Sequence, residues 1–176
     1  MKLLLLIPVF LLVSLFGYSQ DTLEVTPRVY QKNSIYFELF GNALIYGSLN
    51  YERIVLHRKF FYLSVRAGIG GGYIPKATVF SFPLMVNTIF QVHKGGSVEL
   101  GTGATMMFMG IEDGEANELG IWENGNAPIP TGTIGYRYQA KKGFLLRVNF
   151  TPFTNFEEFF YFVGISFGYS FNGKKH

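Results

Sequence analysis

The chain has 176 residues, of which 48% are hydrophobic and 18% aromatic, and its formal net charge is +3. This length predicts one domain, and so small a charge argues against a nucleic-acid partner. The lack of cysteine excludes disulfides, thiolate metal sites and a lipid-modified N-terminal cysteine.

The start of the chain has the pattern of a secretory signal peptide. An apolar run from Leu3 to Phe16 follows a basic residue, and Gly17-Tyr18-Ser19 places small residues at the positions that signal peptidase reads. A membrane anchor is the alternative, but the run is shorter than the roughly 20 residues of a spanning helix and is broken by Pro8. We therefore expect residues 1–19 to be a cleaved signal peptide and residues 20–33 to be a periplasmic lead-in.

From residue 34 onward, apolar residues alternate with small or polar ones, which is the period of a β-strand. Turn signals made of Gly, Pro, Asn or Lys divide this region into eight segments. The predicted strands are Ser34–Gly41, Leu44–Val55, Phe61–Tyr73, Phe80–Val92, Ser97–Met109, Thr131–Gln139, Phe144–Thr151 and Phe160–Phe171. Pro83 conflicts with an uninterrupted strand, so we expect either a bulge there or a strand that begins after it.

The last strand shows the alternation most clearly. Between residues 163 and 171, one parity holds only Gly and Ser, while the other holds apolar and aromatic residues. About ten residues with one apolar face and one small polar face are what a transmembrane β-strand requires. Other strands carry charges on the polar parity, which suits a barrel whose apolar face is turned toward lipid. The sequence therefore predicts an all-β fold, an eight-stranded antiparallel up-and-down transmembrane β-barrel at 34–171, followed by a basic tail at 172–176.

Six charged residues share the inward parity of the predicted strands. They are Glu38, Glu52, Arg66, Glu99, Arg137 and Arg147. Because eight strands enclose a space that side chains just fill, we expect these residues to form a paired structural core. Counting back from the turns places Glu52 diagonal to Arg66, and Arg137 nearly opposite Arg147 with Glu99 between the two guanidinium groups. A proton path or a gated channel is the functional alternative.

The connections between strands differ in charge. Three short ones, at residues 56–59, 93–96 and 140–143, are basic, whereas the longest, Gly110–Pro130, is acidic. Outer-membrane barrels keep short turns on the periplasmic side and long loops outside, so we expect the acidic loop at the cell surface. This loop is the candidate site for an external partner, or for divalent cations that bridge lipopolysaccharide phosphates; a simple solvated loop is the alternative. Its candidate residues are Glu112, Asp113, Glu115, Glu118, Trp122 and Glu123.

Outward-facing aromatic residues are expected near both ends of the barrel, as two membrane interfaces require. Near the periplasmic end we place Tyr51, Phe61, Phe90, Tyr138, Phe144, Tyr169 and Phe171, and near the outer end Tyr73, Phe82, Phe108, Phe150 and Tyr161.

Together these features resemble the small outer-membrane β-barrels typified by the OmpA membrane domain and OmpX. The resemblance covers Ser34 to Phe171 and rests on the signal peptide, the eight strands, the Glu and Arg core and the aromatic last strand. In that family the last strand is read by the barrel-assembly machinery, a role that would fall here to Phe167, Tyr169 and Phe171. The chain departs from the family pattern because residues 172–176 follow the terminal aromatic residue.

The sequence shows no catalytic, metal-binding or cofactor-binding pattern, and its three histidines are all expected at the periplasmic side. We therefore expect a monomeric, non-enzymatic outer-membrane barrel in contact with lipid and lipopolysaccharide. Two alternatives remain open: a soluble periplasmic lipocalin-like carrier of an apolar ligand, and a lipid-modifying outer-membrane enzyme.

Overall fold

The computed structural model describes residues 31–43, 47–58, 61–74, 77–93, 95–111, 126–154 and 159–172. The predicted signal peptide, nearly all of the lead-in, the six candidate residues of the acidic loop and most of the basic tail lie outside these residues.

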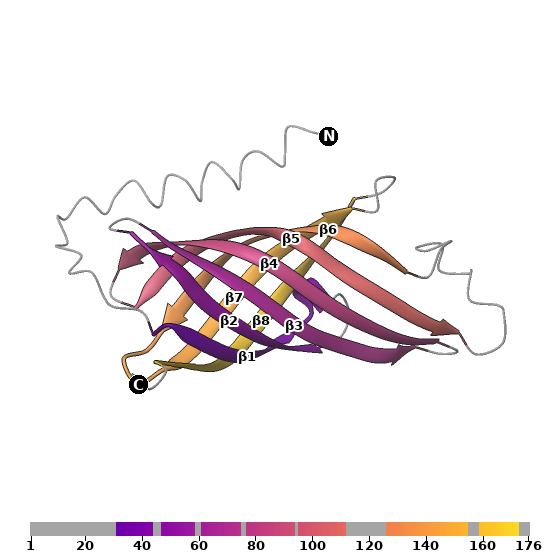
Figure 1. Cartoon of the computed structure of the whole chain (residues 1–176), viewed down its shortest axis with the longest axis horizontal. Helices are drawn as coiled ribbons and strands as arrows, with labels where there is room; N and C mark the ends of the chain where they lie inside the picture. The colour runs from indigo at the N-terminus through magenta and orange to yellow at the C-terminus, as the bar shows by residue number, and fades with distance from the viewer. Residues whose placement is uncertain are drawn as a thin grey trace, which may run out of the picture.

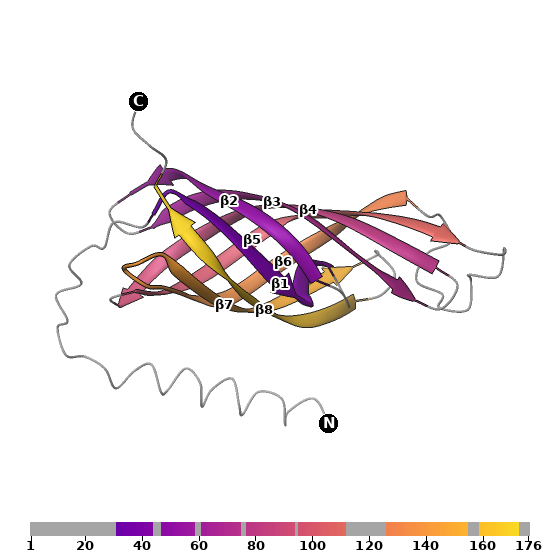
Figure 2. The same ribbon diagram turned by 90° about the horizontal axis from the view of Figure 1, so that it is seen from below.

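The described chain forms a closed antiparallel barrel (Figure 1, Figure 2). Its strands are β1 (Asn33–Leu39), β2 (Gly47–His57), β3 (Tyr62–Ile74), β4 (Ala77–His93), β5 (Gly96–Ile111), β6 (Asn126–Gln139), β7 (Phe144–Thr154) and β8 (Phe159–Phe171). Each strand pairs with the next one in sequence, and β8 pairs with β1. The predicted all-β, eight-stranded antiparallel up-and-down barrel is therefore confirmed. Among the described residues, no helix has the length and apolar character to cross a membrane.

The two ends of the barrel carry different connections. Asn33 at the start of β1 pairs with Phe171 at the end of β8. The same end holds the connections at residues 58–61, 94–95 and 140–143, and we call it the turn end. The opposite end holds the connections that follow β1, β3, β5 and β7, and we call it the loop end.

Exposure alternates along the strands with polar residues inside and apolar residues outside. Glu38, Asn50 and Arg66 are fully buried, whereas outward-facing Leu49 and Val163 are more than half exposed. Each of the predicted aromatic residues is on the outward parity, and ten of the twelve are exposed; Phe61 and Phe171 are half-buried. The barrel therefore has a polar interior and an apolar outer surface.

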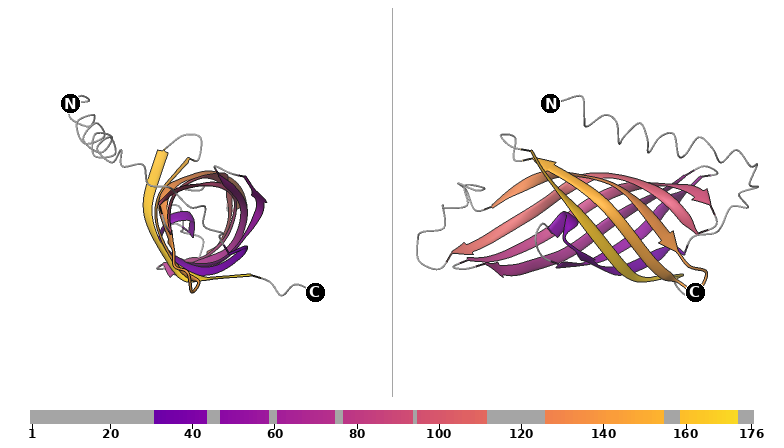
Figure 3. Two further views of the ribbon diagram at one scale, coloured as in Figure 1. Left: turned by 90° about the vertical axis from the view of Figure 1, so that its left-hand side faces the viewer. Right: turned by 180° about the vertical axis from the view of Figure 1, so that it is seen from behind.

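Residues 40–43, which follow β1, fold into the barrel, which the sequence did not predict. β1 ends at Leu39, and the chain turns at Phe40 and Gly41, which have φ angles of 59° and 71°. The 3-10 helix η1 (Gly41–Ala43) then lies inside the ring of strands (Figure 3). Gly41 suits this turn because its φ is positive and because a Cβ there would come within 2.6 Å of the Glu38 carboxylate.

The strands β5 and β6 are longer than predicted. They extend to Ile111 and back to Asn126, so the acidic connection is shorter than the predicted Gly110–Pro130. Pro128 and Pro130 lie in the added part of β6, which pairs with β5 but not yet with β7. Proline is tolerated there because this part of the strand has one neighbouring strand only.

Pro83 lies within β4 and neither ends the strand nor creates a bulge, contrary to both expectations. Ala67 pairs with Leu84 and Gly70 with Ser81, so the register with β3 is the same on either side of Pro83. The ladder omits only the two pairs between them. Gly68 faces the proline ring, and a Cβ at Gly68 would lie 3.0 Å from it. The missing N–H is therefore accommodated by a local gap in the ladder.

Two register shifts do occur, and both lie at the turn end. The pairing of β2 with β3 shifts between Ile54 and Leu56, and the pairing of β4 with β5 shifts between Gln91 and His93. Each shift adds one residue to the first strand of a hairpin, which reverses the parity of the residues that follow.

Candidate functional site

The centre of the interior is a carboxylate between two guanidinium groups. The register places Arg137 of β6 opposite Arg147 of β7, and Glu99 of the neighbouring β5 contacts both. Arg147 Nε donates to Glu99 Oε2 at 3.2 Å, its Nη2 donates to Oε1, and Arg137 Nη1 lies 3.5 Å from Oε2. This is the arrangement that the sequence predicts for these three residues. Glu99 therefore separates two positive charges that would otherwise face each other in a buried space.

Glu52 extends the same network across the barrel. Its Oε2 accepts a hydrogen bond from Arg137 Nη2 at 2.7 Å, and its Oε1 accepts from Ser64 Oγ at 2.5 Å and from Asn87 Nδ2 at 3.3 Å. The predicted diagonal placement of Glu52 relative to Arg66 is wrong, because the shift near the turn brings the two residues directly opposite each other. The ion-pair partner of Glu52 is nevertheless Arg137, since a long side chain can cross so narrow an interior.

Glu38 and Arg66 form a second pair, which η1 completes. Arg66 Nη1 donates to Glu38 Oε2 at 3.3 Å, and Ser166 of β8 donates to the same oxygen at 3.3 Å. The backbone N–H of Asn42 in η1 donates to Glu38 Oε1 at 2.9 Å. The amide oxygen of Asn42 is assigned toward Arg66, from which it accepts, because the opposite orientation would place donors against donors. A further bond runs from Thr105 Oγ1 to the carbonyl of Asn42 at 3.3 Å.

Tyr36 contributes an aromatic contact to the network. Its ring is almost fully buried, and the guanidinium carbon of Arg147 lies 4.6 Å from the ring centroid. A cation over an aromatic face is attracted by the ring quadrupole, and more strongly when water is excluded. Neither Tyr36 nor Asn42 is among the candidate residues that the sequence predicts. The turn-forming pair Gly41-Asn42 was the available signal for the second of them.

The interior network joins every strand of the barrel. All three carboxylates and all three guanidinium groups are at most 1% exposed, and their formal charges cancel. They come from six strands, while Asn87 and Ser166 supply hydrogen bonds from β4 and β8. So dense a set of paired charges fills the middle of the barrel and cross-links it.

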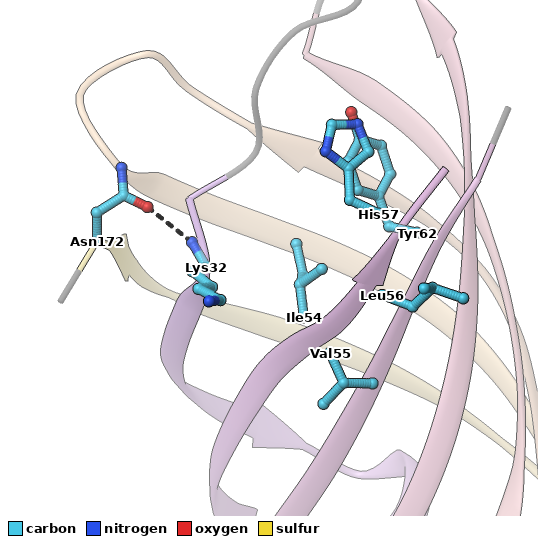
Figure 4. Close-up of a pocket in the computed structure, with 7 residues that line it drawn as sticks. All are labelled: Lys32, Ile54, Val55, Leu56, His57, Tyr62 and Asn172. Carbon is cyan, nitrogen blue, oxygen red and sulfur yellow. Dashed lines mark hydrogen bonds between the residues drawn. The ribbon is translucent and has the colours of Figure 1, made fainter. Parts of the chain in front are cut away.

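The turn end holds an apolar cluster with a cavity beside it. Ile54, Tyr62 and Ile89 form the cluster, and the His57 ring stacks on Tyr62 with the centroids 4.6 Å apart. A cavity of about 370 Å³ lies at this mouth (Figure 4). It is lined by Lys32, Ile54, Val55, Leu56, His57, Tyr62 and Asn172, and the Lys32 N–H donates to Asn172 Oδ1 at 2.9 Å. Within the described residues, no group of three or more His, Cys, Asp or Glu side chains is placed to hold a metal ion.

The remaining candidate residues lie on the outer surface or outside the described residues. Phe167 and Tyr169 are exposed on β8, Phe171 is half-buried, and the Phe167 ring lies 5.8 Å from that of Phe37 on β1. The acidic loop residues Glu112, Asp113, Glu115, Glu118, Trp122 and Glu123 lie in the undescribed connection between β5 and β6.

Comparison with known proteins shows no family for this chain, since no protein-family model matches it and no curated protein is significantly similar.

Proposed function

We propose that the chain is an integral outer-membrane β-barrel with a plugged polar core, and that its role is structural or surface-interacting rather than enzymatic. The observation that carries this proposal is the distribution of side chains between the two faces of the barrel. Fully buried Glu and Arg residues occupy the interior, while Ile, Leu, Val, Phe and Tyr side chains cover the outside. Lipid favours an apolar outer band on a barrel with every strand paired.

The fold alone does not distinguish this protein from a soluble lipocalin-like carrier, which is also an eight-stranded barrel. A carrier would line its interior with the apolar parity and hold a ligand there. Here that parity is outside, and the interior is occupied by the charged network and η1. The distribution of side chains therefore supports the membrane proposal over the carrier.

A non-enzymatic role is supported by the burial of the ionisable groups. The six interior charges are at most 1% exposed and already engage one another, so they cannot reach a substrate. We assign recognition by the barrel-assembly machinery to the outward aromatic residues of β8, which are Phe167, Tyr169 and Phe171. They lie beside β1, where the barrel closes.

Membrane extraction tests the proposal directly. When membranes from expressing cells are washed with alkaline carbonate, the protein is expected to stay in the pellet, and in cold SDS it is expected to migrate differently from a boiled sample. Burial of the apolar outer surface in lipid explains the first result, and closure of all the strands explains the second, because a barrel without free edges resists unfolding. Recovery in the carbonate supernatant would instead support the soluble carrier.

Orientation is tested by proteolysis of whole cells, since a surface role requires the acidic loop to face the medium. A Glu-specific protease is expected to cut within residues 112–123, while Lys141 and Lys142 resist trypsin until the outer membrane is permeabilised. Both lysines are exposed in the turn before β7, so only the membrane would protect them. Cleavage at these lysines on intact cells, with the loop left uncut, would mean that the orientation is inverted.

A further inference from the structure

The bulge in β2 turns a basic residue to the outside of the barrel. Before the bulge, Ile54 is inward and pairs with Ser64; after it, Leu56 pairs with outward-parity Leu63. After the bulge, His57 is on the inward parity and stacks on Tyr62. The next residue, Arg58, is therefore on the outward parity. The Arg58 N–H donates to the carbonyl of Phe61 at 2.9 Å. Without the added residue, Arg58 would share the inward parity of Glu52 and Ile54.

The bulge in β4 has the same effect one hairpin further along. Gln91 pairs with inward-facing Ser97, and His93 then pairs with Gly96 on the outward parity. His93 is exposed, and its Nε2 lies 2.6 Å from the hydroxyl of outward-facing Tyr136 on β6. Two hairpins thus use a bulge at the same end to present a polar residue outward.

A third basic residue, Arg53, lies on the same outer surface. It is exposed and outward-facing, and it forms no ion pair within the described residues. It pairs with Asn33, the first residue of β1, which places it near the turn end. The neighbouring Tyr51 hydroxyl donates to Asn33 Oδ1 at 2.8 Å. An outward arginine costs about 2–4 kcal/mol at the middle of a bilayer but about 0–1 kcal/mol near its interfaces, so this position suits the level of the lipid headgroups.

Contacts link several of these outward residues across neighbouring strands at the turn end. The Phe61 and Phe90 rings, 6.3 Å apart, connect the two bulged hairpins. We define the outward basic band as Arg53, Arg58, Phe61, Phe90, His93 and Tyr136. The acidic residues that the structure describes, Glu38, Glu52 and Glu99, are all buried in the interior, so none of them lies on the outer surface beside these side chains. Within the described residues, the band therefore combines aromatic rings with positive charge that no acid on the outer surface opposes.

We propose that the outward basic band binds the phosphate groups of anionic phospholipids in the leaflet next to the turn end. The inference rests on the proposed membrane insertion and names the lipid that this part of the outer surface selects. Guanidinium groups match phosphate oxygens with two parallel hydrogen bonds, and aromatic side chains are preferred at the headgroup level. The bulges are then the feature that brings Arg58 and His93 to the lipid side of the sheet.

The test is native mass spectrometry of the detergent-solubilised barrel with equal amounts of phosphatidylglycerol and phosphatidylcholine that carry the same acyl chains. The wild-type protein is expected to retain phosphatidylglycerol in preference. Arg53→Gln/Arg58→Gln is expected to lower the ratio of bound phosphatidylglycerol to bound phosphatidylcholine on the order of fivefold for each arginine removed. Arg53→Lys/Arg58→Lys keeps the charge without the paired donors and should give an intermediate ratio.

The matched control is Lys141→Gln/Lys142→Gln, which removes the same two charges from the exposed turn at the same end and should leave the ratio unchanged. An equal loss in both double variants would overturn the proposal, because it would point to the general positive potential of this end. A wild-type protein without preference, or one whose preference survives removal of both arginines, would also overturn it. The heat-dependent gel shift of each sample keeps a failure of the barrel to fold or insert distinct from a failure to select lipid.

Discussion

Replacing Glu99 with glutamine is expected to lower the free energy of unfolding of the barrel by about 3–5 kcal/mol, the usual cost of removing one partner of a buried ion pair. The side chain keeps its size, so the change removes charge and not packing. Arg137 and Arg147, which both contact this carboxylate, would then face each other with only Glu52 left to compensate Arg137.

The measurement is a urea titration in detergent, followed by the fraction of protein that keeps its folded mobility in cold SDS. Lys142→Gln is the control, because this lysine is exposed in a turn and its loss should change stability by no more than about 0.5 kcal/mol. Coincident unfolding curves for the Glu99 variant and the parent would contradict the bridging role of this carboxylate.

Replacing Arg66 with alanine should destabilise the barrel by a similar amount, about 3–5 kcal/mol, because Glu38 would lose the guanidinium group with which it is paired while remaining buried. The matched control is Arg53→Ala on the adjacent strand, where the arginine faces outward and is exposed. In the same detergent assay its effect on stability should be small.

A double-mutant cycle sharpens this test. The double variant Glu38→Gln/Arg66→Met removes both charges together and should be less destabilising than the sum of its single variants Glu38→Gln and Arg66→Met, since neither partner is left buried and unpaired. If the Arg53 and Arg66 variants had equal midpoints, the assignment of the two side chains to opposite faces would be wrong.

The sequence predicted those features of the fold that depend on a period of two. Alternation along each strand was enough to find eight strands and to place Glu38, Glu52 and Arg66 on the inward parity. Counting from a short turn was also enough to set Arg137 against Arg147, because no bulge interrupts that hairpin.

The features that the sequence did not predict depend on the positions at which the two-residue alternation of a strand is interrupted. The residue added near Val55 leaves the hydrophobic pattern of β2 intact and changes only which residues of β3 pair with the end of β2. Arg58 therefore lies on the outward parity although the sequence pattern does not predict it. The inward turn at Phe40 and Gly41 is likewise accompanied by tertiary contacts of Asn42 with Arg66 of β3 and Thr105 of β5, which lie far from it in sequence. The local sequence pattern does not determine whether the segment after a strand folds into the barrel or away from it.

Because the interior network spans all the strands, it can form fully only when the barrel is closed. Its bonds join residues far apart in sequence: Glu52 and Arg137 are separated by 85 positions, and Glu38 and Ser166 by 128. A sheet of fewer strands would leave charged side chains without partners, at a cost of several kcal/mol for each ion that is withdrawn from water. Partly closed states are therefore penalised, and most of the stabilisation is gained only when β8 reaches β1. Folding of such high contact order should be slow and strongly cooperative, with the rate set by closure and not by the formation of single hairpins.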